Sequence, residues 1–415
     1  MRVTVGHRPI TGFAEEYRLQ QSRYPMTPAG WQPVHTVYVP ADRFSADTVA
    51  MWGGQALELI ETHLPGPGEL AEVFGVSEDL APGVHRRLLA KLAAEPVEDL
   101  RIDFEDGYGV RPDDEDGHVE QAATAVVAMH EEGRLPRRWG LRVKSFADAD
   151  PERSVRTLDG FLTEVVARIG ALPPGFALTF PKVLMENYLG QFTAFLEDLE
   201  KGLGLGPLRF EIQVEAPQTL PFLRADLAGG RLAAAHFGVF DYTAAIGLPP
   251  HEQRLDHPAC DHARHVMRTA FAGTGVELSD GSLAAAPASP ATADVHALWR
   301  RHAELVRHSL AHGFYQGWDM HPSHLVSRFA TVYAFHLATY ESYAARVAAW
   351  EQQRQVEGVM DEPATVKTLV TALSRARSAL GEFPPAMPNA APVSTATTAL
   401  GRRSSWTRKR VAGSP

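Results

Sequence analysis

Short runs of apolar residues recur along the chain, and each is followed by a turn and then by a segment with helical periodicity. Ser154–Ile169 and Leu189–Leu203 are two of these helical segments. Because strands that alternate with helices pair in parallel, the pattern predicts an α/β fold with a parallel sheet. The predicted strands are Val34–Pro40, Leu100–Phe104, Trp139–Lys144, Phe176–Lys182, Leu208–Glu215, Ala234–Asp241, Val276–Asp280 and Phe314–His321.

Eight strand–helix units within about 300 residues favour a closed (β/α)₈ TIM barrel over an open sheet. Residues 1–33 are interrupted by prolines and are expected to form an N-terminal extension on a barrel of residues 34–328. Residues 329–383 are expected to form additional C-terminal helices on the two sides of a turn. Residues 384–415 are rich in Pro, Ala, Ser and Thr, which predicts a disordered tail.

The composition narrows the possible partners. The 415 residues carry a formal net charge of −10, without a global basic footprint, so nucleic acid is not an expected partner. The apolar runs are shorter than the roughly 18 residues that span a bilayer, and the N-terminus has no apolar core of signal-peptide length. We therefore expect a cytoplasmic protein without a membrane partner. Cys260 is the single cysteine, which excludes an intramolecular disulfide and a Cys-based zinc site.

Charged residues stand at the ends of most predicted strands, and in a parallel barrel these ends form the active-site face. Glu215 and Asp241 end two consecutive predicted strands. Two carboxylates suit a hard cation such as Mg²⁺, which keeps other positions for water and substrate. The alternative is that each carboxylate caps a helix or forms an ion pair. The other charged residues at these ends are Asp103, Glu105, Asp106, Arg142, Lys144, Lys182, Asp280 and His321.

Nine short motifs follow one another along the chain. They are Val37-Tyr38-Val39-Pro40-Ala41, Asp103-Phe104-Glu105-Asp106, Leu141-Arg142-Val143, Phe180-Pro181-Lys182-Val183, Val214-Glu215-Ala216-Pro217, Phe240-Asp241-Tyr242 with Ile246-Gly247, His262-Ala263-Arg264-His265, Ser279-Asp280-Gly281, and Gly313-Phe314 with Met320-His321-Pro322. In this order they resemble the HpcH/HpaI aldolase and citrate lyase beta-subunit family, which includes malyl-CoA lyases. The resemblance spans roughly Val34 to Arg328 and implies a TIM barrel, a divalent metal and a homo-oligomer, either a trimer or a hexamer.

The resemblance also implies a role for each charged residue. Glu215 and Asp241 would ligate Mg²⁺ or Mn²⁺. Arg142 would stabilise an enolate and bind a substrate carboxylate, unless it forms a buried ion pair with the neighbouring acids. Glu105 and Asp106 would hold metal-bound waters, unless they belong to a solvated loop.

Four further residues are candidates with open alternatives. Lys182 is expected to pair with a nearby glutamate, or to form a Schiff base, which clustered acids oppose by keeping the amine protonated. Arg43 is expected to bind a substrate carboxylate or to form an exposed salt bridge. Asp280 and His321 are expected near the barrel mouth, in contact with substrate or moving protons. Other histidines show no metal-ligand spacing and are expected to be surface or packing residues; they include His251, His257 and His312.

Together these features predict a divalent-metal-dependent carbon–carbon lyase or aldolase. The expected reaction is a reversible aldol or Claisen-type cleavage of a 2-oxo acid or hydroxy-acyl substrate through a metal-stabilised enolate. The partner product would be an aldehyde or an acyl compound. Two alternatives remain open. One is an enzyme that acts on a CoA thioester or on phosphoenolpyruvate with the same metal site. The other is a non-catalytic barrel that serves as a subunit or ligand sensor.

Overall fold

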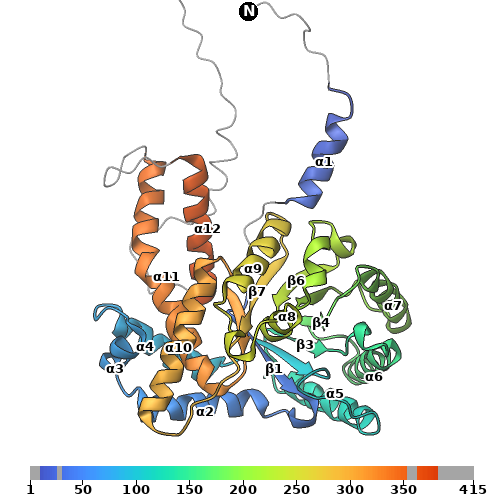
Figure 1. The fold of residues 1–415 in the computed structure, drawn as a ribbon, viewed down its shortest axis with the longest axis horizontal. Helices are drawn as coiled ribbons and strands as arrows, with labels where there is room; N and C mark the ends of the chain where they lie inside the picture. Colours follow the sequence, from blue (N-terminus) through green and yellow to red (C-terminus); the bar gives the residue numbers. More distant parts are fainter. Residues whose placement is uncertain (1–9, 26–29, 353–361, 382–415) are drawn as a thin grey trace, which may run out of the picture. The chain divides into compact units, whose positions relative to one another are not determined.

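The computed structural model describes residues 10–25, 30–352 and 362–381. Its centre is a closed barrel of eight parallel strands in chain order, in which the eighth strand pairs with the first (Figure 1). Each predicted run overlaps one strand, so the (β/α)₈ prediction is confirmed. The strands are β1 (His35–Pro40), β2 (Asp99–Asp103), β3 (Arg138–Arg142), β4 (Phe176–Phe180), β5 (Phe210–Val214), β6 (Leu232–Phe237), β7 (Glu277–Ser282) and β8 (Gln316–Asp319).

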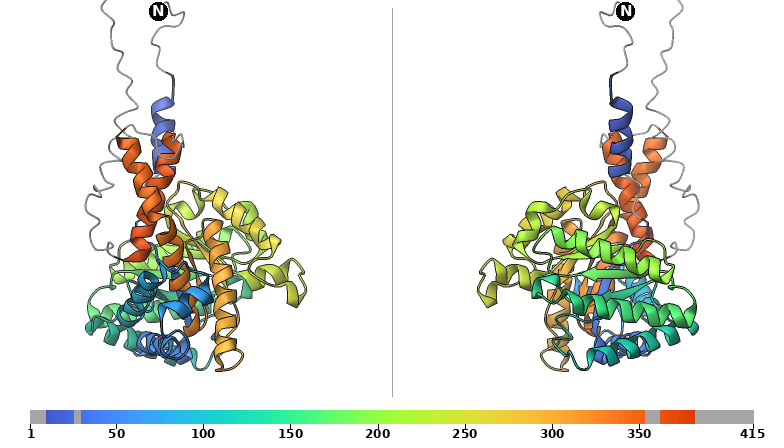
Figure 2. Two further views of the ribbon diagram at one scale, coloured as in Figure 1. Left: turned by 90° about the vertical axis from the view of Figure 1, so that its left-hand side faces the viewer. Right: turned by 90° about the vertical axis from the view of Figure 1, so that its right-hand side faces the viewer.

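Helices cover the outside of the barrel (Figure 2). Neighbouring helices also contact one another, as α5 does with α6 and α10 with α3. These helices are α2 (Thr48–His63), α3 (Pro67–Phe74), α4 (Ala81–Ala94), α5 (Glu115–Glu131), α6 (Pro151–Ile169), α7 (Asn187–Leu203), α8 (Val239–Ala245), α9 (Pro258–Ala270) and α10 (Thr292–Ala311).

The strands place apolar residues toward the helices and polar residues inside the barrel. In β2, Leu100 and Ile102 are buried beneath the helices, whereas Arg101 bonds across the barrel interior to Glu211 on β5. Because side chains alternate along a strand, Asp103 shares the inner face with Arg101. The barrel interior is therefore polar, and its carboxyl end opens onto the acidic strand ends.

Two segments flank the barrel in the sequence. The N-terminal helix α1 (Phe13–Arg23) has no buried residue, and Arg23 pairs with Asp226 at 2.8 Å. At the other end, α11 (Pro322–Glu351) and α12 (Pro363–Leu380) are the two predicted C-terminal helices. The chain divides into two compact units, residues 1–332 and 333–415.

The second unit has its own apolar contacts. Val366, Leu369, Val370 and Leu373 are buried with helical spacing along α12. The predicted boundary after residue 328 stays a prediction, and the predicted tail, 384–415, lies outside the described residues. In the part of the chain that the structure describes, no helix is both long and apolar enough to cross a membrane.

Candidate metal centre

A cavity of about 490 Å³ opens at the carboxyl end of the barrel. Larger hollows of about 710 and 620 Å³ lie elsewhere, around Glu186–Arg231 and Val49–Arg137, apart from the strand-end acids. The residues that line the barrel cavity are Tyr38, Pro40, Arg43, Asp103, Asp106, Gly107, Arg142, Glu215, Gly238, Val239, Phe240, Asp241, Ser282, Trp318 and Met320. Five predicted site residues therefore line one cavity: Arg43, Asp106, Arg142, Glu215 and Asp241.

The two predicted metal ligands reach the cavity in different ways. Glu215 directly follows β5 and is buried, and its Oε1 accepts a hydrogen bond from the backbone N of Lys182 at 2.8 Å. Asp241 is exposed and lies in the first turn of α8. The prediction that Asp241 ends a strand is wrong, because β6 ends at Phe237 and the chain turns into α8 at Gly238.

Gly238 allows the close approach of these two segments. A Cβ at this position would lie 2.4 Å from Glu215 Cβ and 2.6 Å from its Oε2, well inside van der Waals contact. The backbone N of Gly238 also donates to the carbonyl O of Val214 at 3.0 Å. Glycine is therefore required at position 238, directly after β6, where the backbone passes the Glu215 carboxylate.

Asp103 organises the loop that carries the other acids. Its carboxylate accepts hydrogen bonds from the backbone N of Glu105 at 2.9 Å and of Gly107 at 3.0 Å. It also pairs with Arg142 through two parallel contacts, Nε to Oδ1 at 2.6 Å and Nη2 to Oδ2 at 2.7 Å. Asp103 thus holds the loop and Arg142 in place, and it also lines the cavity.

Arg142 is almost fully engaged by protein groups. Besides the Asp103 pair, its Nη1 lies 3.0 Å from Glu105 Oε2 and 3.3 Å from Gln213 Oε1. Burial lowers the pKa of Arg142, but the Asp103 carboxylate overcomes this effect and holds the pKa well above its ordinary value. The structure therefore contains the buried ion pair. The Asp103 pair uses the Nε N–H and one of the two N–H groups of Nη2, so the other N–H of Nη2 is left for another partner.

Lys182 lies behind the cavity with a left-handed backbone, φ 46°. Its Nζ contacts the carboxylates of Glu105 and, at 2.6 Å, of Asp106. Burial lowers the pKa of this amine, but the two carboxylates raise it by more, so the net shift is upward. The amine is therefore held in its charged form, which opposes a Schiff-base role.

These residues form a cluster with excess negative charge, which we call the mouth cluster. Burial and the charge of Glu105 raise the pKa of Glu215 to about 8, and burial also raises the pKa of Asp241. Both carboxylates therefore lack sufficient positive charge nearby, and such hard oxygen donors fit a divalent cation. The formal charge of the cluster is −3, because it joins two cations, Arg142 and Lys182, to five carboxylates: Asp103, Glu105, Asp106, Glu215 and Asp241.

The three remaining candidates have different positions. Arg43 lies in a 3-10 turn after β1, lines the cavity and is exposed, and no ion pair is recorded for it within the described residues. Asp280 is not among the residues that line the cavity. The register of β7 against β8 is irregular between Ser279 and Ser282, and the Asp280 carboxylate is taken by Arg264 Nε at 2.9 Å.

His321 also lies away from the cavity lining. Its Nδ1 accepts a hydrogen bond from the backbone N of Ser323 at 3.1 Å and so caps the start of α11. Burial lowers the pKa of this imidazole. The expected substrate contacts at Asp280 and His321 are not supported by these positions.

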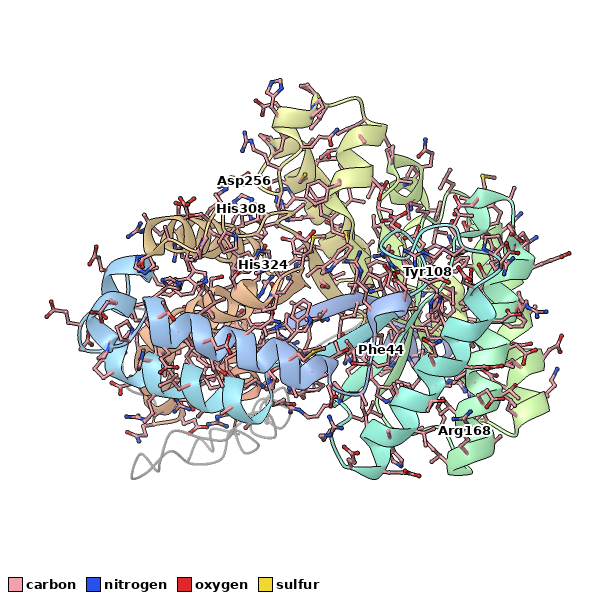
Figure 3. All side chains as sticks on the ribbon, turned by 90° about the horizontal axis from the view of Figure 1, so that it is seen from below. Phe44, Tyr108, Arg168, Asp256, His308 and His324 are labelled. Atoms are coloured by element: carbon pink, nitrogen blue, oxygen red, sulfur yellow. The ribbon has the colours of Figure 1, made fainter. Side chains whose placement is uncertain are left out.

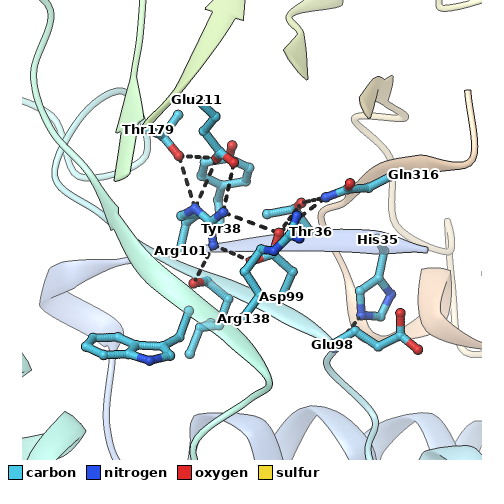
Figure 4. A network of polar contacts seen from close by, with 12 residues as sticks. His35, Thr36, Tyr38, Glu98, Asp99, Arg101, Arg138, Thr179, Glu211 and Gln316 are labelled. Atoms are coloured by element: carbon cyan, nitrogen blue, oxygen red, sulfur yellow. Dashed lines mark hydrogen bonds and ion pairs between the residues drawn. The ribbon is translucent and has the colours of Figure 1, made fainter. Parts of the chain in front are cut away.

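A second buried network was not anticipated from the sequence. Arg101 on β2 bonds to Glu211 through Nε at 3.0 Å and through Nη2 at 2.9 Å (Figure 4). The signal for it was the alternation of Asp99, Arg101 and Asp103 on one face of β2, which places Arg101 inside the barrel. The network, called the Arg101 network below, comprises Thr36, Asp99, Arg101, Thr179, Glu211 and Gln316.

A family model described as "Domain of unknown function (DUF6986)" matches residues 14–387. The chain belongs to the DUF6986 family. No curated protein matches this DUF6986 chain in sequence. The match covers the barrel together with both C-terminal helices.

Solved structures resemble this chain at low sequence identity, and the first of the three below shares its fold. A citrate lyase from Burkholderia xenovorans LB400 is 19% identical with a TM-score of 0.57, over 87% of this chain and 97% of that one. A malate synthase from Haloferax volcanii is 14% identical with a TM-score of 0.49, over 83% and 90%. CitE from Mycobacterium tuberculosis is 19% identical with a TM-score of 0.46, over 84% and 98%. The resemblance to the citrate lyase beta-subunit family is thus confirmed for the fold.

Proposed function

We propose that this chain is a divalent-metal-dependent carbon–carbon lyase or aldolase. The observation that carries the proposal is the mouth cluster, in which five carboxylates meet two cations around a cavity at the carboxyl end of a parallel barrel. This end is where barrel enzymes bind their substrates. The Arg101 network lies deeper in the same barrel, and none of its six residues lines this cavity.

Glu215 and Asp241 are the residues that would hold Mg²⁺ or Mn²⁺. The cation would act as a Lewis acid toward a carbonyl oxygen of a 2-oxo acid or hydroxy-acyl substrate. Glu105 and Asp106 are held in place by Lys182, so they are positioned to accept hydrogen bonds from water near the carboxylate pair. Lys182 in turn stays protonated, and it lowers the negative charge of the cluster without closing the cavity.

Two arginines supply positive charge for the substrate. Arg142 keeps one Nη2 N–H beyond its described contacts and would direct it toward the oxygen on which enolate charge develops. Arg43 is exposed at the rim without a recorded partner, and its planar guanidinium suits bidentate binding of a carboxylate. The two cations would thereby fix a substrate that carries an anionic group at one end and a reacting carbonyl at the other.

The decisive experiment is a metal-dependent screen of the full chain. Pairs of 2-oxo acids and aldehydes would be assayed together with hydroxy-acyl-CoA thioesters. The thioesters are included because the fold neighbour from Burkholderia is named a citrate lyase. Chelation should abolish turnover, and Mg²⁺ or Mn²⁺ should restore it. Undiminished turnover in chelator, with borohydride trapping at Lys182, would contradict the proposal and establish a Schiff-base mechanism.

If the screen detects no turnover, binding measurements test the alternative of a non-catalytic barrel. If a 2-oxo acid then binds in a metal-dependent way, the barrel is a ligand sensor. If neither metal nor ligand binds, the proposal is wrong. A trimeric or hexameric assembly is implied by the family resemblance only, and a cytoplasmic location is an expectation from the sequence. Both are predictions for sedimentation and localisation measurements.

A further inference from the structure

A group of potential metal ligands lies between α9 and α10, away from the barrel mouth. His308 lies in the last turn of α10 and His312 directly follows the helix, and both face Asp261 on α9. The Nε2 atom of His308 lies 2.8 Å from Asp261 Oδ1, and that of His312 lies 3.5 Å from the same oxygen. The three side chains are 22–28% exposed, so a dissolved ion can reach them; His308 is labelled in Figure 3.

The hydrogen bonds around His312 fix which nitrogen is free. Its Nδ1 lies 2.9 Å from the carbonyl O of His308. Because a carbonyl oxygen only accepts, Nδ1 carries a proton, and Nε2 is the nitrogen that can face a metal. Nε2 faces the Asp261 carboxylate, so a metal would take the place of a proton between the two groups. A backbone carbonyl that orients the second nitrogen is also the usual arrangement behind a metal-bound histidine.

We propose that Asp261, His308 and His312 bind a divalent transition metal of the Zn²⁺ type. Imidazole nitrogens suit such metals, whereas Mg²⁺ prefers oxygen ligands, so this site and the mouth cluster would select different ions. Three protein ligands leave a fourth tetrahedral position to water or to His265. The ring of His265 lies 5.5 Å from that of His312.

Arg264 is the one competing cation in these contacts, and the carboxylate can serve both. Its Nη1 donates to Asp261 Oδ1 at 2.7 Å. The recorded contacts of Asp261 all involve Oδ1, so Oδ2 remains for a metal while Arg264 keeps its bond. Arg264 also holds Asp280 on β7 at 2.9 Å, which links the site to the barrel wall. A bound metal would therefore clamp α9 to α10 and stabilise the attached part of the barrel.

A second group of similar composition shows what a purely structural arrangement looks like. His302, Asp319 and His324 are buried, and every ring nitrogen of the two histidines has a partner. His324 accepts from the backbone N of Met320 at 3.3 Å and lies 2.9 Å from the carbonyl O of Ala285. Asp319 is already paired with Arg328 at 2.7 Å. A metal there would have to enter a buried site and break several hydrogen bonds, whereas at Asp261 the side chains are partly exposed and a metal would replace the single His308–Asp261 hydrogen bond.

The test measures zinc binding to the full chain by calorimetry, in an excess of Mg²⁺ that occupies the mouth cluster. We expect one equivalent of Zn²⁺ in the wild type. The variants His308→Ala and His312→Ala should bind at least tenfold more weakly. His262→Ala is the matched control, because His262 is exposed on the same helix α9 and belongs to no recorded cluster. This control should bind like the wild type, and so should Glu215→Gln.

Two further measurements separate the outcomes. Co²⁺ bound to the site should give the visible absorption of a four-coordinate ion, which His312→Ala should lose. Zinc should raise the thermal midpoint of the wild type but not that of His312→Gln. The glutamine variant keeps a polar side chain, and it replaces the alanine variant if the latter folds poorly. The proposal is overturned if the wild type binds no zinc, if the His308→Ala/His312→Ala double variant still binds it, or if Glu215→Gln alone removes it.

Discussion

Glu211 and Glu215 lie four residues apart, within and directly after β5, and both are buried inside the same barrel. Burial raises the pKa of each, but their net shifts are opposite. The charge of Arg101 overcomes burial at Glu211 and holds its pKa well below the ordinary value. At Glu215 the cations are insufficient, and the pKa is raised to about 8.

The difference lies in whether the carboxylates around each glutamate are balanced by nearby cations and hydrogen-bond donors. The Arg101 network is internally satisfied, because its guanidinium meets two carboxylates and a hydroxyl at hydrogen-bond distance. The mouth cluster has more carboxylates than cations and opens to a cavity. A buried charge with its partners present contributes to a unique fold, and an unbalanced one is a candidate for binding. The predictions below test this contrast.

The largest effect is expected for Glu215→Gln. The amide keeps the shape but removes the ligand charge, so turnover and Mg²⁺ affinity should both fall, turnover by about 10³-fold or more, which corresponds to about 4 kcal/mol. The free energy of unfolding of the metal-free protein should not decrease, because the carboxylate has too little positive charge nearby. Calorimetry and urea denaturation measure the two quantities. Retained metal binding would remove Glu215 from the proposed ligands.

Arg101→Leu should have the opposite profile. It leaves Asp99 and Glu211 buried without their counter-ion, which typically costs about 3–5 kcal/mol of unfolding free energy. Urea denaturation measures the change. Arg156→Ala is the control, since Arg156 forms an exposed pair with Asp116 whose loss should change the stability little. A fully stable Arg101→Leu variant would show that the Arg101 network does not stabilise the barrel.

Arg142→Ala tests a residue that belongs to both descriptions, because it is ion-paired and also lines the cavity. If its free Nη2 N–H faces the enolate, turnover should fall by about 10² to 10³ while Mg²⁺ affinity changes much less. Arg142→Lys should also be poor, because lysine lacks the planar fork. Turnover within a few-fold of the wild type would exclude the catalytic role. A failure to fold would identify Arg142 as a structural counter-ion of Asp103.

Gly238→Ala should have the smallest effect on turnover and a moderate effect on stability. The new Cβ would lie 2.4 Å from Glu215 Cβ, and such overpacking costs about 1–3 kcal/mol. Because the displaced atom belongs to a proposed ligand, Mg²⁺ affinity should fall as well. Gly190→Ala in α7 is the control, since nothing lies within 4 Å of a Cβ at that position. Equal thermal midpoints and metal affinities in both variants would refute the close contact.

The sequence predicted the barrel because each strand is a short apolar run, and that signal needs no knowledge of distant contacts. It also placed Arg142, Glu215 and Asp241 together, since residues after parallel strands share one end of a barrel. The direction of individual side chains, such as those of Asp280 and His321, could not be predicted in the same way. The irregular register of β7 turns Asp280 toward Arg264, and the cap on α11 occupies His321.

Two groups were missed for different reasons. Arg101 lies in the middle of a strand, where the search for chemistry at strand ends did not reach. His308 and His312 have ligand spacing at the end of α10, and the expectation that His312 is a surface or packing residue stays a prediction that zinc binding would test. Their partner Asp261 lies 47 residues before His308, and only the packing of α9 beside α10 brings the three together.

The separation of the Arg101 network from the mouth cluster has a consequence for how such a protein changes over time. On the proposed function, folding would depend on residues deep in the barrel, whereas substrate choice would depend on cavity-lining residues such as Arg43, Phe240 and Met320. New substrates can therefore be explored by substitutions at the rim without altering the groups that secure the strands. A library that randomises these three positions should consist mainly of folded proteins and should contain variants that have exchanged one substrate for another.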